Sequence, residues 1–118
     1  LIHELFECTD FNNLDNLSDN NKKIIERFLE KVDISHANIY KEYEFIYDED
    51  NTTYHGIIDL MLEYQDNIKI IDYKLKNIND EAYIKQLTGY KNYIEKLFNK
   101  KTGIYLYSIT LNTLEEIK

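Results

Sequence analysis

Two strand-like runs, each carrying one acidic residue, constrain this chain more than any other feature. Residues 54–64 and 68–74 are rich in Ile, Leu and Tyr, and the polar residues 65–67 between them indicate a turn. This pattern predicts a β-hairpin, although the turn lacks the Asn-Gly pair that favours the tightest connection. Asp59 and Asp72 stand where each run would otherwise have an apolar residue. These two carboxylates are therefore the first candidates for a functional site.

Side chains alternate between the two faces of a strand, and this brings the candidates together. Asp72 and Lys74 project from the same face of the second run, while Asp59 shares a face of the first run with Ile57 and Met61. We expect two carboxylates and one ammonium group to converge on the hairpin. Carboxylates suit Mg²⁺, a bound metal acidifies water, and a nearby lysine stabilises developing negative charge. The set favours metal-dependent phosphodiester cleavage, whereas an isolated Asp-x-Lys is more often a surface ion pair.

A long helix is predicted after the hairpin, at residues 79–99, with Asn79 or Asp80 as its N-terminal cap. One stripe of this helix is aromatic and contains Gln86, with Tyr90 four residues later on the same face. Leu or Ala would be more usual at the position of Gln86. A glutamine buried in such a stripe needs hydrogen-bond partners.

The remaining elements follow from the hydrophobic periodicity. Helices are predicted at residues 1–8 and 21–32, and strands at 39–47 and 103–110. The resulting order is helix, helix, strand, strand, strand, helix, strand. This order predicts an α/β fold with a central mixed β-sheet flanked by α-helices. Residues 113–118 are expected to be frayed or to begin a further element.

Composition limits the classes of protein that remain. The length of 118 residues suits a single domain, and the missing initiator Met leads us to expect a domain, 1–118, cut from a larger chain. Only one cysteine is present, Cys8, which excludes an internal disulfide and a four-cysteine cluster; we expect it to be buried on the first helix. No apolar run is long enough to span a membrane and no signal peptide is evident, so a cytoplasmic setting follows by default. The net charge of −8 argues against tight autonomous DNA binding.

The order and spacing of these residues resemble the PD-(D/E)xK nuclease superfamily, and more narrowly the nuclease domain of RecB/AddA helicase–nucleases. That family carries a G-x-x-D strand, a D-Y-K strand and a helix with Q-L-x-x-Y. The matching residues here are Gly56 with Asp59, then Asp72-Tyr73-Lys74, then Gln86-Leu87 with Tyr90. The proline of the superfamily name is absent. The resemblance extends from His3 to about Ser108 and implies a restriction-endonuclease-like core.

The resemblance also implies roles for individual residues. RecB-type nucleases carry H-x-x-x-E on their first helix, matched here by His3 and Glu7, and the histidine is a metal ligand. The implied residues are the metal ligands His3, Asp59, Asp72 and the Tyr73 carbonyl, then Lys74 acting on the nucleophilic water, and Gln86 and Tyr90 orienting the site. Removing either carboxylate is expected to preserve or raise stability, because like charges repel.

Two further residues keep alternative interpretations. Glu42 matches the acidic position of the family's E-x-P-F strand, with Glu44 in place of the proline. It is a candidate acid of the metal site, or else a solvated glutamate on an edge strand. His55 could approach the site, but an ordinary strand residue is the simpler interpretation.

The function that the resemblance implies is a Mg²⁺-dependent DNA exonuclease domain of an AddA/RecB-like helicase–nuclease, active in double-strand break repair and recombination. Mn²⁺ is a possible substitute, and no iron–sulfur cluster is expected. The implied partners are DNA, helicase domains of the same chain and an AddB/RecC-like subunit. One alternative is a non-catalytic module of the same fold that docks a helicase or binds DNA. Another is a stand-alone nuclease of phage or CRISPR type.

Overall fold

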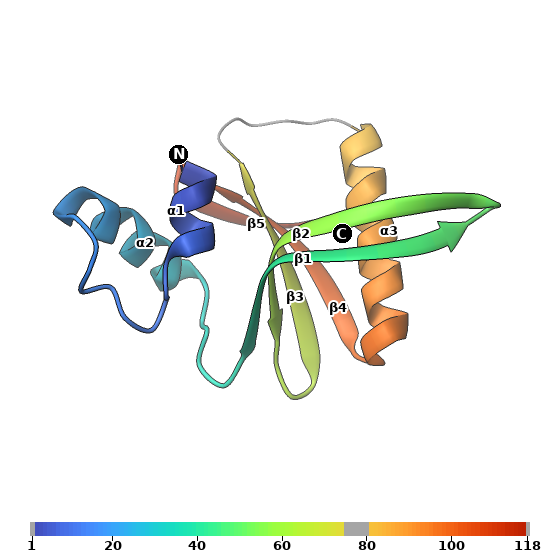
Figure 1. Ribbon diagram of the computed structural model, residues 1–118, viewed down its shortest axis with the longest axis horizontal. Coiled ribbons are helices and arrows are strands. Elements are labelled where there is room, and N and C mark those ends of the chain that lie inside the picture. Colours follow the sequence, from blue (N-terminus) through green and yellow to red (C-terminus); the bar gives the residue numbers. More distant parts are fainter. Residues whose placement is uncertain (1, 75–80, 118) are drawn as a thin grey trace.

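The computed structural model describes residues 2–74 and 81–117 and shows a five-stranded sheet between helices (Figure 1). The elements are α1 (Ile2–Cys8), α2 (Asp19–Lys31), β1 (Asn38–Glu49), β2 (Thr52–Glu63), β3 (Asn67–Lys74), α3 (Glu81–Phe98), β4 (Lys101–Ser108) and β5 (Thr113–Ile117). The strands lie side by side in chain order, and all neighbours are antiparallel except β3 and β4, which are parallel. Parallel neighbours need a crossover, and α3 lies between them in the sequence. The predicted α/β class is confirmed and is compatible with a restriction-endonuclease-like core.

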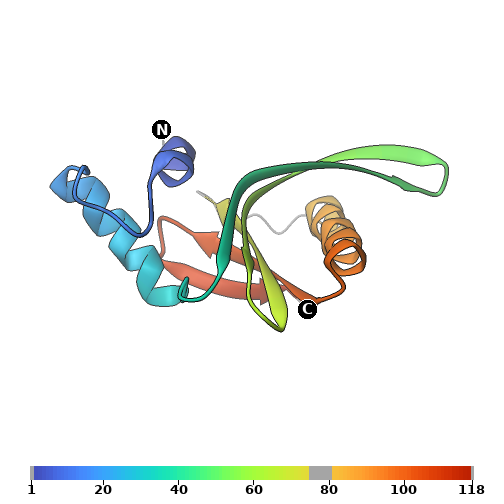
Figure 2. The same cartoon turned by 60° about the horizontal axis from the view of Figure 1, so that its bottom comes forward.

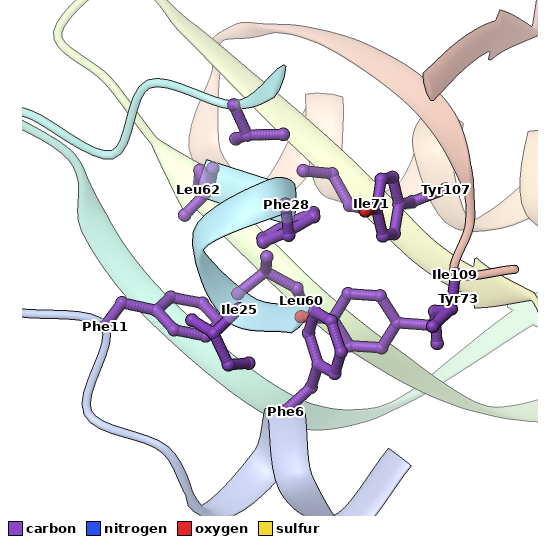
Figure 3. Packing of buried hydrophobic residues seen from close by; sticks show 11 residues of the cluster. Phe6, Phe11, Ile25, Phe28, Leu60, Leu62, Ile71, Tyr73, Tyr107 and Ile109 are labelled. Atoms are coloured by element: carbon purple, nitrogen blue, oxygen red, sulfur yellow. The ribbon is translucent and has the colours of Figure 1, made fainter. Parts of the chain in front are cut away.

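The sheet separates two apolar cores. On one face, α1 and α2 pack through Phe6 and Phe28 against Tyr73 and Tyr107 of the sheet (Figure 3). Ring centroids are 4.5 Å apart for Phe6 and Tyr73 and 4.8 Å apart for Phe28 and Tyr107. On the other face, α3 packs on a second core. Its buried residues are Phe45, Ile58, Met61, Ile68, Ile70, Leu87, Tyr90, Ile94 and Ile104.

The hairpin of β2 and β3 forms as predicted. Its antiparallel ladder runs from the pair Glu63 and Ile68 to the pair Leu60 and Ile71. The side chains of β3 alternate as expected, with Ile68 on the α3 side and Ile71 and Tyr73 on the side of α1 and α2. The candidate residues at the end of β3 are therefore positioned by a strand that is buried on both faces.

Local signals explain most of the helix and turn boundaries. Ser18 caps α2, and its hydroxyl accepts a hydrogen bond from the Asn21 N–H at 3.3 Å. The connection between β1 and β2 consists of Asp50 and Asn51 alone. Asp50 and Asn51 adopt positive φ values of 52° and 63°, so β1 and β2 join through a tight turn.

The structure decides two expectations about the ends of the chain. Residues 113–117 form β5 and pair antiparallel with β4, so the expectation of a further element is confirmed and that of a frayed end is wrong. The weak alternation in this short segment gave no strand signal by itself, and the neighbouring strand supplies its hydrogen bonds. Cys8 is exposed rather than buried, since it ends α1 on the side away from the core.

The ribbon of β1 and β2 reverses its faces at one rung. Lys41 reaches α1 and Leu60 lies in the core of α1 and α2, so regular alternation would direct Phe45 and Ile58 to the same side. Both instead belong to the α3 core. The register of the two strands stays constant across the change, but Glu42 has a positive φ of 49°. Beyond this point the ribbon arches over α3 (Figure 2).

This reversal changes one prediction about Asp59. Asp59 was expected to share a face with Ile57 and Met61, yet Met61 lies in the α3 core while Ile57 is 44% exposed. The rung that reverses lies at Glu42 and Asp59, between the pairs Lys41–Leu60 and Tyr43–Ile58. Alternation counted along the sequence therefore fails at the acidic residues themselves.

Two glycines let aromatic rings approach the backbone of the ribbon and of α3. A Cβ at Gly56 would overlap the ring of Phe45 on the neighbouring strand. A Cβ at Gly89 of α3 would lie 2.8 Å from the hydroxyl of Tyr47. Gly56 thus marks a close approach, one of the two interpretations that its place in a strand suggests. The close fit holds the arched ribbon against α3.

Candidate functional site

Asp59 occupies the point where the ladder between β2 and β3 ends. The last backbone pair is Leu60 and Ile71, and Asp59 and Asp72 occupy the next positions. Here the Tyr73 N–H donates to Oδ2 of Asp59 at 3.1 Å, so a side chain continues the hydrogen bonding that the backbone has stopped. The Asp59 side chain is 18% exposed and therefore accessible to an ion or a substrate.

His3 reaches the same place from α1. Its Nε2 lies 3.7 Å from Oδ2 of Asp59 and 3.3 Å from the carbonyl oxygen of Tyr73. Three of the four implied metal ligands therefore meet, although they come from α1, β2 and β3. Phe6 is fully buried in the core and fixes the helix that carries His3.

Lys41 holds the other end of α1. Its ammonium donates to the carbonyl oxygen of Phe6 at 2.9 Å and to that of Thr9. These carbonyls lie at the C-terminal end of α1, where a cation is favourable. Burial lowers the pKa of Lys41, while nearby carboxylates such as Asp10 act in the opposite direction. The sequence analysis did not single out this lysine, because its role depends on a contact between distant elements.

Asp72 has a different neighbour. The hydroxyl of Tyr83, in the first turns of α3, donates a hydrogen bond to Oδ2 of Asp72. Tyr83 belongs to the same helical stripe as Gln86, which was the available sequence signal for its position. Over residues 2–74 and 81–117, no three His, Cys, Asp or Glu side chains are arranged as a ready-made metal site. A metal that used Asp72 would therefore compete with Tyr83.

The donor atoms nevertheless have suitable separations for a hard cation. Adjacent ligands of an octahedral ion bound at about 2.1 Å lie about 3.0 Å apart. The 3.7 Å from His3 to Asp59 and the 3.3 Å from His3 to the Tyr73 carbonyl are slightly longer than this. Small inward movements would bring these three donors onto one ion.

Glu42 lies beside Asp59, and the pKa of Glu42 is shifted by its surroundings in the site. Burial raises the pKa of Glu42, and the negative charge of Asp59 raises this pKa further. Its positive φ is unusual for a residue with a long side chain, and such conformations cost about 1–3 kcal/mol. Two neighbouring carboxylates and a strained backbone are typical of a cation-binding or catalytic place. Of the two interpretations of Glu42, an acid of the metal site or a solvated glutamate, the first is favoured, because its carboxylate adjoins the candidate site.

The remaining candidates are Gln86, Tyr90 and Lys74, and one of them, Gln86, does not have the expected burial. Gln86 is exposed, so the expected burial of this residue in an aromatic stripe is wrong, while Tyr90 is 6% exposed and packs edge-on against Phe45. Burial raises the pKa of Tyr90, and a hydrogen bond with the Ile57 main chain acts against this. Lys74 ends β3, and its side chain lies outside the described part of the chain.

His55 follows the simpler of its two interpretations. It lies on the arched ribbon, where its Nε2 is 3.2 Å from Oε2 of Glu44. Both side chains are more than half exposed, at 56% and 65%. This is a surface pair of the kind that contributes little to stability.

Sequence comparison relates the chain to helicase/nuclease proteins. It is 38% identical over 95 residues to an ATP-dependent helicase/nuclease subunit from Clostridium beijerinckii, and 32% identical over 94 residues to the one from Clostridium acetobutylicum. These alignments cover 74% and 73% of this chain, but only 8% of each relative. The same subunit from Clostridium botulinum is 31% identical over 87 residues. No family model matches.

The similarity therefore indicates a region related to RecB/AddA-type helicase–nucleases. The chain spans less than a tenth of the length of the curated relatives that it matches. Within residues 2–74 and 81–117, no helix has both the length and the apolar character needed to cross a bilayer.

Proposed function

We propose that this chain is a metal-dependent DNA exonuclease domain of the PD-(D/E)xK type, within an AddA/RecB-like helicase–nuclease that processes double-strand breaks. The observation that carries the proposal is the meeting of three donors: His3 Nε2, Asp59 Oδ2 and the Tyr73 carbonyl, with Asp72 on the adjoining strand. The names of the reported relatives, which are helicase/nuclease subunits, support a role related to helicase–nucleases.

The residues of the site have separable tasks in this proposal. A bound Mg²⁺ or Mn²⁺ would acidify water and neutralise charge on the phosphate. His3, Asp59 and the Tyr73 carbonyl would hold the ion, while the Tyr73 N–H keeps Asp59 in position. Tyr83 keeps the Asp72 carboxylate in place until an ion takes over that interaction.

Three residues would act on the substrate rather than on the ion. Lys74, two residues after Asp72 on β3, would stabilise the charge that develops on the phosphate. Replacing Lys74 with alanine should then slow cleavage by about 10²–10³-fold and leave metal affinity nearly unchanged. Gln86 and Tyr90 would orient the strand along α3.

The partners follow from the charge and from the relatives. A domain with a net charge of −8 attracts polynucleotide weakly, so DNA would be delivered by helicase domains of the same protein and by an AddB/RecC-like subunit. A cytoplasmic setting follows from this role. No iron–sulfur cluster belongs to the proposal, since the chain has one cysteine.

The test is metal-dependent hydrolysis of linear DNA, followed by the release of nucleotides with Mg²⁺, with Mn²⁺ and with EDTA. Asp59→Asn and Asp72→Asn should abolish release. Asp66→Asn is the matched control, since it changes an exposed aspartate in the turn between β2 and β3. Release by both site variants at the wild-type rate would refute the assignment of Asp59 and Asp72 to the site, and a wild-type protein that releases no nucleotides with either metal would refute the nuclease activity.

A non-catalytic module is the second candidate, and one observation favours it. The Asp72 carboxylate is already engaged by Tyr83, as in a site that no longer takes an ion. Isothermal titration separates the two candidates. A nuclease should bind Mn²⁺ in a manner that Asp59→Asn and Asp72→Asn weaken, whereas a non-catalytic module should show no such site.

A further inference from the structure

A groove lies between the arched ribbon and α3, next to the candidate metal site. Its volume is about 560 Å³, within the usual range for small-ligand pockets. Tyr47 and Tyr54 line it from the ribbon, and Tyr83, Gln86 and Tyr90 line it from α3. Tyr83 also donates its hydroxyl to Asp72, so one residue belongs both to the groove and to the site.

Four aromatic rings form a cluster whose last two members, Tyr47 and Tyr54, line this groove. Tyr93 and Phe45 are nearly parallel, at 7°, with centroids 5.0 Å apart. Tyr47 contacts both of these rings, with centroids 5.8 Å from Phe45 and 5.4 Å from Tyr93, and Tyr54 stacks on Tyr47 at 20° and 5.2 Å. Tyr54 is the last ring and is 43% exposed. A stack that ends in an exposed ring offers a place for one more flat ring.

The charge of the chain decides what kind of contact could hold a polynucleotide here. With a net charge of −8, general attraction for phosphates is unfavourable. Among the described residues that line the groove, Lys85 is the only lysine or arginine. Base stacking on an aromatic ring does not depend on charge, so it can act where phosphate attraction cannot.

We propose that this groove binds an unpaired nucleobase of the strand being cut, stacked on Tyr54 with its polar edge toward Gln86. This inference rests on the proposed nuclease function and specifies its substrate as single-stranded at the site. A base within a duplex has both faces covered by its neighbours and cannot extend the stack. Gln86 is exposed and lines the groove, and its amide offers both a donor and an acceptor to a base edge.

The test is direct binding of a single-stranded DNA oligonucleotide that contains 2-aminopurine, in EDTA so that metal-dependent hydrolysis does not occur. The wild-type protein should quench the fluorescence of the base by stacking. Tyr54→Ala should weaken binding by roughly 5- to 150-fold, the range for loss of one stacking ring. Tyr54→Trp should retain binding. Leu111→Ala, which changes a still more exposed apolar residue in the turn between β4 and β5, is the control and should bind like the wild type.

Salt dependence and a duplex provide two more readouts. If stacking dominates, the slope of log affinity against log salt should not exceed that of about one phosphate contact, about 0.7 for a single strand. A blunt duplex of the same sequence should bind more weakly than the single strand. Unchanged binding by Tyr54→Ala, a steep salt slope or a preference for the duplex would each overturn the inference.

These results remain distinct from a failure of the nuclease proposal. A wild-type protein that cleaves DNA while Tyr54→Ala binds normally refutes the base site alone. A wild-type protein that binds and quenches the oligonucleotide but never cleaves it supports the base site and refutes the nuclease activity.

Discussion

Asp59→Ala tests how the candidate site is built into the fold. Oδ2 of Asp59 accepts the Tyr73 N–H at 3.1 Å where the backbone ladder stops. Removing the carboxylate leaves that donor without a partner, which costs about 1–3 kcal/mol for a buried group. Relief of the repulsion between Asp59 and Glu42 offsets part of this cost. Sequence reasoning, which considered only repulsion, predicted unchanged or raised stability; the structure predicts a loss.

Asp59→Asn is the matched variant, because asparagine keeps an acceptor of the same size and removes the charge. We expect its free energy of unfolding in EDTA to lie within about 1 kcal/mol of the wild type. Urea denaturation followed by circular dichroism measures both variants, and equal slopes would confirm that the same surface unfolds. Asp59→Ala should unfold at lower urea than Asp59→Asn.

Addition of metal extends the experiment to function. At a Mg²⁺ concentration of 100 times its dissociation constant, the wild type should gain about 2.7 kcal/mol. Neither variant should gain as much, since both lack the Asp59 carboxylate. If Asp59→Ala unfolds at the same urea concentration as the wild type in EDTA, the hydrogen bond to Tyr73 contributes nothing and the reasoning fails.

Three further predictions follow from the same neighbourhood. The pKa of Glu42 is raised in the folded state, so its contribution to stability is present at acid pH and is lost as pH rises through the folded-state pKa. In urea titrations across that pH range, Glu42→Gln should have the same free energy of unfolding as the wild type in acid and a higher one at neutral pH. The Tyr73 hydroxyl is buried without a hydrogen-bond partner in the described structure, so Tyr73→Phe should raise the free energy of unfolding by about 1 kcal/mol or more and leave cleavage unchanged; a loss of stability would reveal a hidden partner. His3→Ala should cost more Mn²⁺ affinity than Mg²⁺ affinity in isothermal titrations, because imidazole favours Mn²⁺, and unchanged affinity for both ions would return His3 to a surface role.

The sequence was sufficient for the first four strands of the sheet and for the pairing that carries the candidate residues Asp59 and Asp72. The runs around Asp59 and Asp72 are long and strongly β-forming, so their pairing followed from local pattern. The hairpin register then placed the two carboxylates on neighbouring strands. His3 was expected at the site through the family resemblance alone, since no local pattern links residue 3 to residue 59. The structure brings them to 3.7 Å because Phe6 anchors α1 in the core.

Other features depended on tertiary contacts that no local pattern records. The exposure of Gln86 depends on where the ribbon lies over α3, and the contact of Tyr83 with Asp72 depends on how α3 is oriented. The reversal at Glu42 also escaped prediction, since glutamate carries no preference for a positive φ. An aromatic run such as Tyr43, Phe45 and Tyr47 shows that one face is apolar, but it cannot show which helix that face meets.

The reversal at Glu42 explains how the ribbon of β1 and β2 contributes both to the candidate site beside α1 and to the groove over α3. Regular alternation would leave Phe45 facing the side of α1, and the ribbon would have no aromatic face for α3. With the reversal, the rung that carries Glu42 and Asp59 stays beside α1 while the rest of the ribbon forms a wall of the groove. The strain at Glu42 is offset by the aromatic packing beyond it, which buries Phe45 against Tyr90 and Tyr93. The proximity of Glu42 to Asp59 and the packing of Phe45 over α3 are therefore consequences of a single distortion. A substitution that relaxed this distortion would change both the candidate metal site and the aromatic groove.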